Sequence, residues 1–348
     1  MKFSDLKSTI LEQFKTTHEV VPFIVGKPGG GKSSCAREIA QELAVTHKIP
    51  SERIIEFNPS LREPCDVLGL PQFHGECTKW LPPEEFWALR QGVGPCVLIL
   101  EELSDADMNM QNPLCRVVLD RCAGQLRLSD QLFIIATSNR TEDRSGANRL
   151  STKLANRMRE LEFTENLDDW LEWAQANNVP VKLQAFLRFR PSLLSDFDAK
   201  HSRNPTPRSW ASVALIPESI EKKAKLFREH VAGSVGDGAA AEYVGFLRVM
   251  KRLPSTERII NDPERIEIPS ANDIQWATIA QLSSVLTTHN AEAIWTYTAR
   301  LNPEMTVAAA KMYLSANRKD FTSAKTRDGN NLYSTVVARF LLKSGLLI

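Results

Sequence analysis

The chain has 348 residues, of which 43% are hydrophobic and 24% charged, and its 43 Lys and Arg residues nearly balance 42 Asp and Glu, giving a net charge of +1. This length favours two or three domains, and the composition excludes a disordered or fibrous chain. The near-neutral charge disfavours a protein that mainly coats nucleic acid. No apolar run reaches the roughly 18 residues that a membrane span needs, and the charged N-terminus lacks the apolar core of a signal peptide. We therefore expect a soluble, cytoplasmic protein.

All six cysteines lie in the first 122 residues, and no pair has C-x-x-C spacing. A zinc site or a disulfide framework requires clustered spacings. We expect reduced cysteines that pack as small hydrophobic side chains, and we assign no metal to the six scattered histidines.

Over residues 1–165, short apolar runs alternate with helical patterns, which predicts an α/β domain with a parallel sheet. The three strongest strand predictions and two weaker ones are, in order, 20–25, 97–100 and 132–136, then 53–57 and 160–163. Because the strong strands are apolar on both faces, we expect helices on both sides of the sheet.

Beyond residue 165 the pattern is mostly helical. We expect a helical lid over 166–253 and a helical C-terminal region over 254–348, with a Pro-rich linker at 254–269. Small residues at 232–238 predict a flexible connection. The large aromatic residues of these helices are expected in the core; they are Trp170, Trp173, Phe186, Trp276 and Trp295.

A phosphate-binding motif follows the first predicted strand. The pattern G-x-x-x-x-G-K-[ST] is satisfied by Gly26, Lys27, Pro28, Gly29, Gly30, Gly31, Lys32 and Ser33. Glycines let backbone N–H groups curl around phosphate oxygens, Lys32 can reach the β- and γ-phosphates, and the Ser33 hydroxyl can ligate Mg²⁺. A helix predicted over 34–47, which begins at Ser34, directs its positive end at the anion. This context predicts that the chain binds ATP or ADP.

Polar residues follow the next two strong strands. Glu101 and Glu102 come after 97–100, and Asn139 ends the third strand. Ligands bind at the carboxyl ends of parallel strands, where one carboxylate can hold the Mg²⁺ shell and a second can polarise the attacking water. Asn139 can orient water or contact the γ-phosphate. Each signal taken alone has a simpler reading, a solvated acidic loop or ordinary turn chemistry.

This order of motifs resembles that of an AAA+ ATPase. Details resemble its MoxR-like branch: residues 65–69 precede an insert at 70–80, expected to be a short hairpin, Gly94 and Pro95 precede the second strand, and 135–139 end the third. The resemblance covers about the first 250 residues. It implies an αβα P-loop NTPase core followed by an α-helical lid, and an enzyme that converts ATP and water to ADP and phosphate.

The resemblance also assigns roles to the acidic pair. Glu101 is expected to bind Mg²⁺ through water, and Glu102 to activate the attacking water. The family usually has Asp-Glu where this chain has Glu101-Glu102, so we expect looser metal placement and slow hydrolysis.

Two arginines complete the site that the resemblance implies. Arg157 is similar in place to an arginine finger, which stabilises the transferring phosphoryl group in a neighbouring subunit; Arg149 and Arg159 are rivals. Arg208, which follows Pro207, is similar to the sensor 2 arginine of the lid. The alternatives are a surface ion pair for the first and an exposed side chain in a proline-started helix for the second.

A site built from two chains implies a head-to-tail ring, which is hexameric in the family. The family implies a chaperone-like ring ATPase that remodels or activates a partner protein, often one with a von Willebrand A domain. Contact loops are expected at 70–80 and 104–111. In the second loop a pore is expected to be faced by Asp105, Asp107, Met108 and Met110.

Two other functions stay open. The first is a nucleotide-switched DNA-associated module of the helicase-loader or initiator type. The net charge disfavours it, the sequence has no recognisable helix-turn-helix or zinc module, and the basic clusters at 222–225 and 248–252 are typical of solvated helix faces. The second is a small-molecule kinase, which Asn139, the two arginines and the helical C-terminus disfavour.

Overall fold

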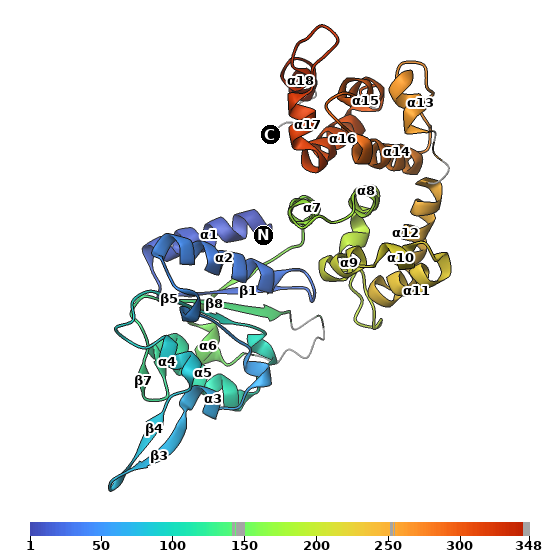
Figure 1. Ribbon diagram of the computed structural model, residues 1–348. Helices are drawn as coiled ribbons and strands as arrows, with labels where there is room; N and C mark the ends of the chain where they lie inside the picture. Colours follow the sequence, from blue (N-terminus) through green and yellow to red (C-terminus); the bar gives the residue numbers. More distant parts are fainter. Residues whose placement is uncertain (141–142, 144–149, 251–252, 254, 344–348) are drawn as a thin grey trace. The chain divides into compact units, whose positions relative to one another are not determined.

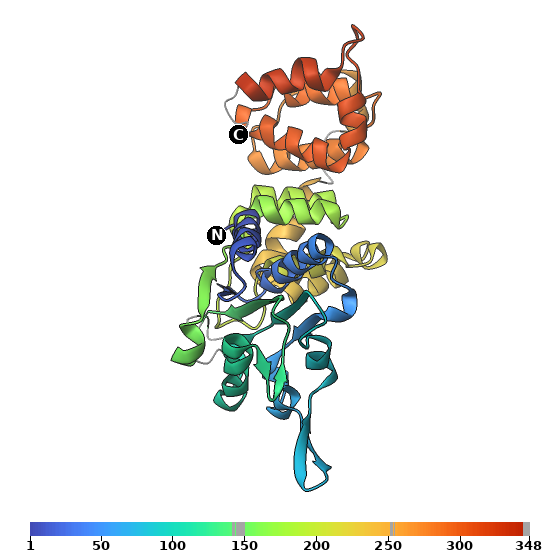
Figure 2. The same ribbon diagram turned by 90° about the vertical axis from the view of Figure 1, so that its left-hand side faces the viewer.

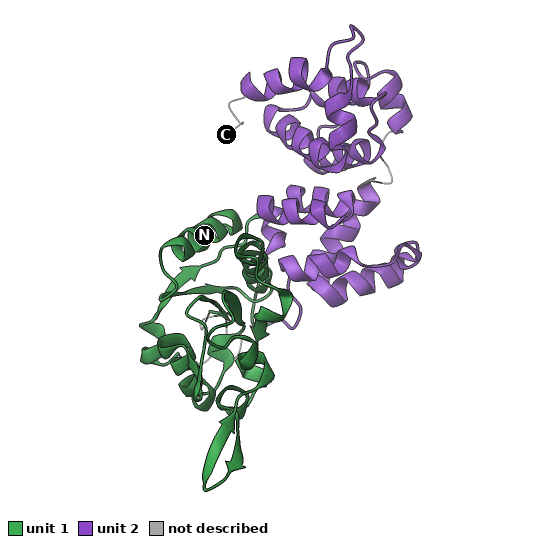
Figure 3. Ribbon diagram, turned by 60° about the vertical axis from the view of Figure 1, so that its left-hand side comes forward, with its two compact units in different colours: residues 1–166, 197–200 green, residues 167–196, 201–348 purple. Residues whose placement is uncertain are grey.

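The structure is a computed structural model that describes residues 1–140, 143, 150–250, 253 and 255–343. The chain forms two compact units (Figure 3). Unit 1 contains residues 1–166 and 197–200, and unit 2 contains 167–196 and the described residues from 201 onward. In the described residues, every helix is too short or too polar to cross a membrane.

Unit 1 is built on a five-stranded sheet with the order β2-β5-β8-β1-β9, in which all neighbouring strands are parallel. Its strands are β1 (Val21–Gly26), β2 (Ile54–Phe57), β5 (Cys96–Leu100), β8 (Leu132–Asn139) and β9 (Met158–Glu162). Each contains most of a predicted strand, so the predicted parallel α/β fold is confirmed. Two short antiparallel pairs lie outside this sheet, formed by β3 (Leu70–His74) with β4 (Cys77–Leu81) and by β6 (Cys122–Ala123) with β7 (Leu126–Arg127).

Alternate residues of the central strands enter two different cores, because successive side chains of a strand point to opposite faces. Ile24, Ile99 and Ile135 pack with α1 (Phe3–Thr16) and α2 (Lys32–His47). Their strand neighbours pack on the other face, against α3 (Cys65–Leu68), α4 (Glu84–Ala88), α5 (Met108–Asp120) and α6 (Thr152–Ala155). Helices therefore cover both sides of the sheet, as predicted. Short 3₁₀ turns complete unit 1: η1 (Ser51–Arg53), η2 (Pro59–Leu61) and η3 (Leu103–Asp105).

The β3–β4 hairpin extends away from the rest of unit 1 (Figures 1 and 2). Every residue of both strands is exposed. The hairpin extends one residue beyond the insert predicted at 70–80, and the register pairs Pro71 with Trp80 and Phe73 with Thr78. These four side chains share one face of the hairpin, because residues directly opposite each other lie on the same side.

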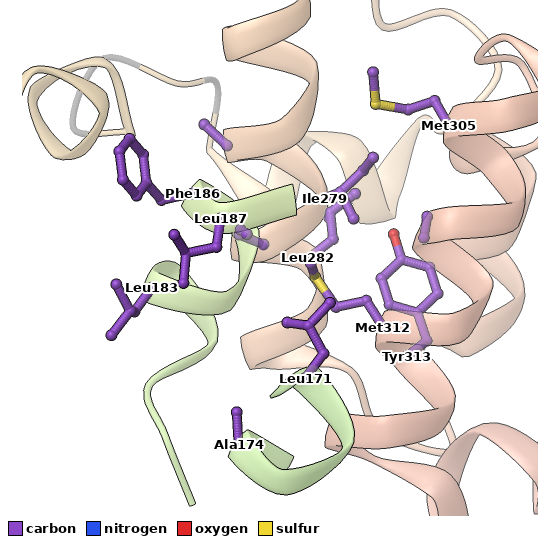
Figure 4. Close-up of a cluster of buried hydrophobic side chains, with 14 of the residues drawn as sticks. Leu171, Ala174, Leu183, Phe186, Leu187, Ile279, Leu282, Met305, Met312 and Tyr313 are labelled. Carbon is purple, nitrogen blue, oxygen red and sulfur yellow. The ribbon is translucent and has the colours of Figure 1, made fainter. Parts of the chain in front are cut away.

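Unit 2 is helical. Its helices are α7 (Leu167–Ala176), α8 (Val181–Phe189), α9 (Pro207–Ala214), α10 (Glu218–Glu221), α11 (Ala224–Val235), α12 (Asp237–Met250), α13 (Thr256–Asn261), α14 (Asn272–Val285), α15 (Ala291–Thr298), α16 (Pro303–Ala316), α17 (Arg318–Ser323) and α18 (Ala338–Lys343), with a 3₁₀ turn η5 (Pro191–Leu194) and a π-helical turn η6 (Tyr333–Val337). One hydrophobic core runs from α7 to α18. Figure 4 shows part of it, with Leu171 of α7 close to Met312 of α16. This core contains residues from both sides of the boundary expected between residues 253 and 254. The separation of a lid from a C-terminal region therefore stays a prediction.

The prediction of a flexible connection at 232–238 is wrong. Residues up to Val235 continue α11, and Gly236, with φ +84°, separates it from α12. Val231 and Val235 are buried, one turn apart. Small residues favour flexibility only where nothing packs on them, and here Val231 and Val235 hold this part of α11 in the core. Part of the predicted linker at 254–269 is also helical, as α13.

The packing of the cysteines and aromatic residues differs in part from the prediction. All six cysteines are free thiols, but Cys65 and Cys77 are exposed and Cys122 is half-buried, so only the other three pack in the core. Trp170 is buried, whereas Trp173 is 41% exposed. Trp173 is wrongly predicted because hydrophobicity alone does not identify the helix face: α7 directs Trp170, Leu171 and Ala174 inward.

Candidate nucleotide-binding site

The phosphate loop joins β1 to α2. Gly29 has φ +73° and Gly31 has φ +112°, values that L side chains rarely adopt, so both positions favour glycine. Helix α2 begins at Lys32, two residues before the predicted start. Ser33 and Ser34 therefore lie in its first turn, where backbone N–H groups have no partner within the helix and can bind an anion.

Lys32 is buried, with 8% of its surface exposed. Its Nζ donates to Gly26 O at 2.9 Å, to Lys27 O at 2.7 Å and to Asn139 Oδ1 at 2.9 Å. The sheet register explains the last contact, because Gly26 and Asn139 are paired at the ends of the neighbouring strands β1 and β8. Two residues 107 positions apart, both predicted for the site, thus meet directly.

Glu101 directly follows β5 and pairs with an arginine for which the sequence predicted no role. Its Oε1 accepts from Nη2 of Arg37 in α2 at 2.9 Å. The Arg37 Nε also donates to Glu56 of β2, at 2.9 Å to Oε2. Arg37 therefore bridges the carboxylates of two neighbouring strands. The side chain of Glu101 is only 17% exposed, which strengthens this ion pair relative to one at the open surface.

Glu102 has an unusual backbone conformation and a specific partner. Its φ of +53° and ψ of +40° place it in the left-handed region, which is costly for a residue with a side chain and is often found at functional sites. Its Oε2 accepts a 2.9 Å hydrogen bond from Nδ2 of Asn58, the residue after β2. This bond fixes the carboxylate of the expected general base.

Asp105 is a further carboxylate at this edge of the sheet. Burial raises its pKa above the ordinary value of 3.8; the charge of Glu102 adds to this effect, and Lys32 opposes it. Its Oδ1 is buried and has no hydrogen-bond partner among the described residues. The neighbouring Ser104 hydroxyl contacts the Ser138 hydroxyl and so links the loop after β5 to β8.

The expected pore loop at 104–111 is only partly exposed. Met108 is 53% exposed, but Met110 is 1% exposed and belongs to the core of unit 1. Asp107 caps α5 by accepting from the Met110 N–H. The prediction that Met110 faces a pore is therefore wrong, because the loop becomes helix at Met108 and turns that side chain inward.

Arg157 lies at the opposite edge of the sheet from the phosphate loop. It precedes β9, whose first residue Met158 is paired with Val21, the first residue of β1. The five steps along β1 to Gly26 cover about 16 Å at roughly 3.3 Å per residue. Arg157 is exposed, and no other described residue forms a hydrogen bond or ion pair with its guanidinium.

Arg159 and Arg149 are the two alternatives to Arg157 as the arginine finger. Arg159 Nη1 donates to Gln13 Oε1 of α1 at 2.9 Å, so its guanidinium has a partner within unit 1. Arg149 lies outside the described residues.

Arg208 is the second residue of α9 in unit 2 and is exposed. Thr206 and Ser209 form a capping box, and Pro207 takes the first helical position, which suits its missing N–H. The helix therefore begins as predicted. The role of Arg208 as sensor 2 stays a prediction.

The residues fit a nucleotide with Mg²⁺. Glycines at 29 and 31 expose backbone N–H groups, and Ser33 and Glu101 offer oxygen ligands, which Mg²⁺ prefers; it is usually held by one or two carboxylates together with substrate phosphates. The described residues contain no group of three or more His, Cys, Asp and Glu that could hold a metal by itself.

The sequence did not assign Asn58, Arg37 or Glu56 to this site, and it placed Asp105 at a pore instead. Asn58 follows β2 just as Asn139 ends β8, so the rule that ligands bind at strand ends could have found it. Arg37 lies four residues after Ser33, a spacing that places both on one face of a helix. For Glu56 and Asp105 the sequence carries no comparable signal.

Comparisons with known proteins give little further information. No family model and no curated protein matches the chain. Among solved structures, the chain is similar to a DNA polymerase III gamma subunit-related protein from Thermotoga maritima, with 11% identity, a TM-score of 0.40 and coverage of 97% of this chain and 98% of that chain. It is also similar to NtrX from Brucella abortus in complex with ATP, with 15% identity, a TM-score of 0.34 and coverage of 99% and 68%. These TM-scores are too low to assign a fold, so the fold is assigned from the parallel sheet and the phosphate loop of this chain.

Proposed function

We propose that the chain is an AAA+ ATPase that binds Mg-ATP at the phosphate loop and hydrolyses it to ADP and phosphate. The observation that carries this proposal is the 2.9 Å bond from Lys32 Nζ to Asn139 Oδ1. Four adjacent strands of the sheet supply the polar groups at this edge: Asn58 after β2, Glu102 after β5, Asn139 on β8, and the loop with Lys32 after β1.

Each of these residues has a role in the proposed reaction. The loop N–H groups and Lys32 bind the phosphates, and Ser33 and Glu101 would hold Mg²⁺, which neutralises phosphate charge when bound. Glu102 accepts a proton from the attacking water, and its bond to Asn58 positions the carboxylate. Because Arg37 already holds Oε1 of Glu101, metal binding competes with this ion pair.

We further propose that Arg157 completes the site of a neighbouring copy. At about 16 Å along the sheet it is far from its own phosphate loop, and its exposed guanidinium is available to another chain. Such a heterologous contact closes into a ring when the rotation allows, and we propose a hexamer. Arg208 of the helical unit would contact the γ-phosphate in the same chain.

The hairpin supports a MoxR-like remodelling function for this ring. Phe73 is 91% exposed and Trp80 38% exposed on one face of the hairpin, and clustered exposed apolar side chains are typical of protein contacts. We propose that the hairpin contacts a partner protein, such as one with a von Willebrand A domain. Replacing Phe73 and Trp80 by Ser should leave basal ATP hydrolysis unchanged and abolish stimulation by the partner.

The ATPase proposal is tested by measuring nucleotide binding and phosphate release with Mg²⁺ in parallel. Lys32→Ala should lose binding, whereas Glu102→Gln should bind ATP but not hydrolyse it. Glu84→Gln, a matched change of an exposed glutamate in α4, should behave as the wild type. Absence of nucleotide binding by the wild type, or wild-type hydrolysis by Glu102→Gln, would contradict the proposal.

A further inference from the structure

The segment that follows β9 runs beside the phosphate loop. Phe163 N donates to Val25 O of β1 at 2.7 Å. A methyl group placed on Gly26 would lie 2.7 Å from the Phe163 carbonyl oxygen, closer than two such atoms approach in proteins. The first glycine of the motif therefore makes room for this segment, and the segment is fixed against the start of the loop.

Two residues further on, the side chain of Glu165 lies against Gly30. A methyl group on Gly30 would lie 2.3 Å from Glu165 Oε1 and 3.0 Å from its Cδ. Unlike Gly29 and Gly31, Gly30 has no positive φ, and the motif accepts any residue at this position. The backbone therefore does not require glycine here, and a methyl group at this position would have to displace the Glu165 side chain.

One oxygen of this carboxylate lacks a hydrogen-bond donor. Glu165 Oε1 is buried and has no hydrogen-bond partner among the described residues. A buried oxygen without a donor costs free energy, and a negative charge beside a phosphate-binding loop opposes the charge of the ligand that the loop would bind. If residue 165 only stabilised the fold, an apolar side chain, or a polar one with a hydrogen-bond partner, would be favoured at this position.

We propose that Glu165 is a nucleotide-responsive residue that lowers the affinity of the phosphate loop for nucleotides. This inference rests on the proposed function, because it requires a phosphate ligand at the loop. The repulsion acts in both directions: the carboxylate weakens phosphate binding, and bound phosphate drives the carboxylate away from Gly30. Glu165 lies two residues before α7, where unit 2 begins along the chain. Binding of phosphate would therefore displace a residue in the segment that connects the two units.

The proposal is tested by titrating the full chain with ADP, with and without Mg²⁺. Glu165→Gln keeps the size of the side chain and removes its charge, so it should bind ADP about tenfold more tightly in the absence of Mg²⁺. The gain should be smaller with Mg²⁺, which neutralises phosphate charge. Glu160→Gln is the matched control, since it removes one charge from an exposed position of β9 and should leave the affinity unchanged.

The titration separates the two proposals. Unchanged affinity of Glu165→Gln, with normal binding by the wild type, overturns the role of Glu165 and leaves the ATPase proposal standing. Weaker binding by Glu165→Gln also overturns it, since the carboxylate would then accept a hydrogen bond from the nucleotide. No binding by the wild type overturns both proposals.

A second measurement tests the contact without any nucleotide. Gly30→Ala should lower the midpoint of thermal unfolding, because the added methyl meets the Glu165 carboxylate. In a Glu165→Ala background the same substitution should cost much less, so the two effects should not be additive. Equal losses in both backgrounds would show that the carboxylate does not lie against Gly30 and would overturn the proposal.

Discussion

Charged side chains at the two edges of the central sheet differ in their hydrogen-bond partners. At the carboxyl edge, Lys32 is bonded to Asn139 and Glu102 to Asn58, so the side chains hold one another in place before any ligand binds. At the amino edge, Arg159 is bonded to Gln13, while Arg157 is exposed with no partner among the described residues. One edge is thus organised as a binding site, and the other presents a cation outward. The exposed guanidinium of Arg157 is the group that we propose acts on a second copy of the chain.

The largest effect is expected at the amino edge. Arg157→Ala should reduce ATP hydrolysis by about a thousandfold, since an arginine that stabilises the transferring phosphoryl group contributes at this scale. ATP binding should be retained, because the phosphate loop is at the other edge. Hydrolysis per chain should rise with protein concentration in the wild type.

Arg159→Ala is the control for this comparison. It removes the bond to Gln13 and should lower thermal stability, while hydrolysis per folded chain stays the same. If Arg159→Ala abolished hydrolysis and Arg157→Ala did not, the assignment of the two arginines would be reversed.

The next effect is expected at the carboxyl edge. Glu102→Gln should reduce the rate of hydrolysis by at least about a hundredfold, the contribution of a general base, with the ATP dissociation constant unchanged. Single-turnover phosphate release measures the chemical step directly. A rate within a factor of two of the wild type would show that another group activates water, and Asp105 would be the first to examine.

A smaller effect tests whether the carboxyl edge is organised in advance. Asn58→Ala removes the hydrogen bond to Glu102 and should lower kcat about tenfold without changing nucleotide affinity, since one hydrogen bond to a charged group has this scale. Ser60→Ala is the matched control: it removes a bond to Asn58 Oδ1 but keeps the donor to Glu102. Equal kcat values for Asn58→Ala and the wild type would mean that Glu102 does not need this partner.

The smallest effect concerns Asp105 and pH. Burial raises its pKa above 3.8, so the folded chain binds this proton more tightly than the unfolded chain. Stability therefore falls as pH rises from about 3.8 through the folded pKa, and the loss is complete above it. Asp105→Asn should raise the unfolding midpoint at neutral pH, and this gain should shrink as pH falls toward 4. Asp5→Asn, at an exposed position of α1, should give no such trend.

The sequence predicted the sheet well because its strands carry strong local signals. All five strands lie within three residues of their predicted ends, and the apolar runs around Ile24, Leu98 and Ile134 correspond to strands buried on both faces. The phosphate loop and Asn139 were found because their residue types are tied to chemistry at strand ends.

The rest depended on information that no local pattern contains. The bond between Asn58 and Glu102 joins residues 44 positions apart through the order of the strands. The contact between Gly30 and the Glu165 side chain joins residues 135 positions apart. The helical state of 232–235 depended on packing within unit 2, which outweighed the small residues in the sequence.

The most direct test of the central claim, that one hydrolytic site is built from two copies, is to mix two inactive variants. Glu102→Gln keeps Arg157, and Arg157→Ala keeps Glu102, so a mixed assembly contains sites with both residues intact. Each variant alone should release almost no phosphate, and mixing them at constant total concentration should restore a substantial fraction of wild-type hydrolysis. A mixture that stays as inactive as its components would contradict a shared site.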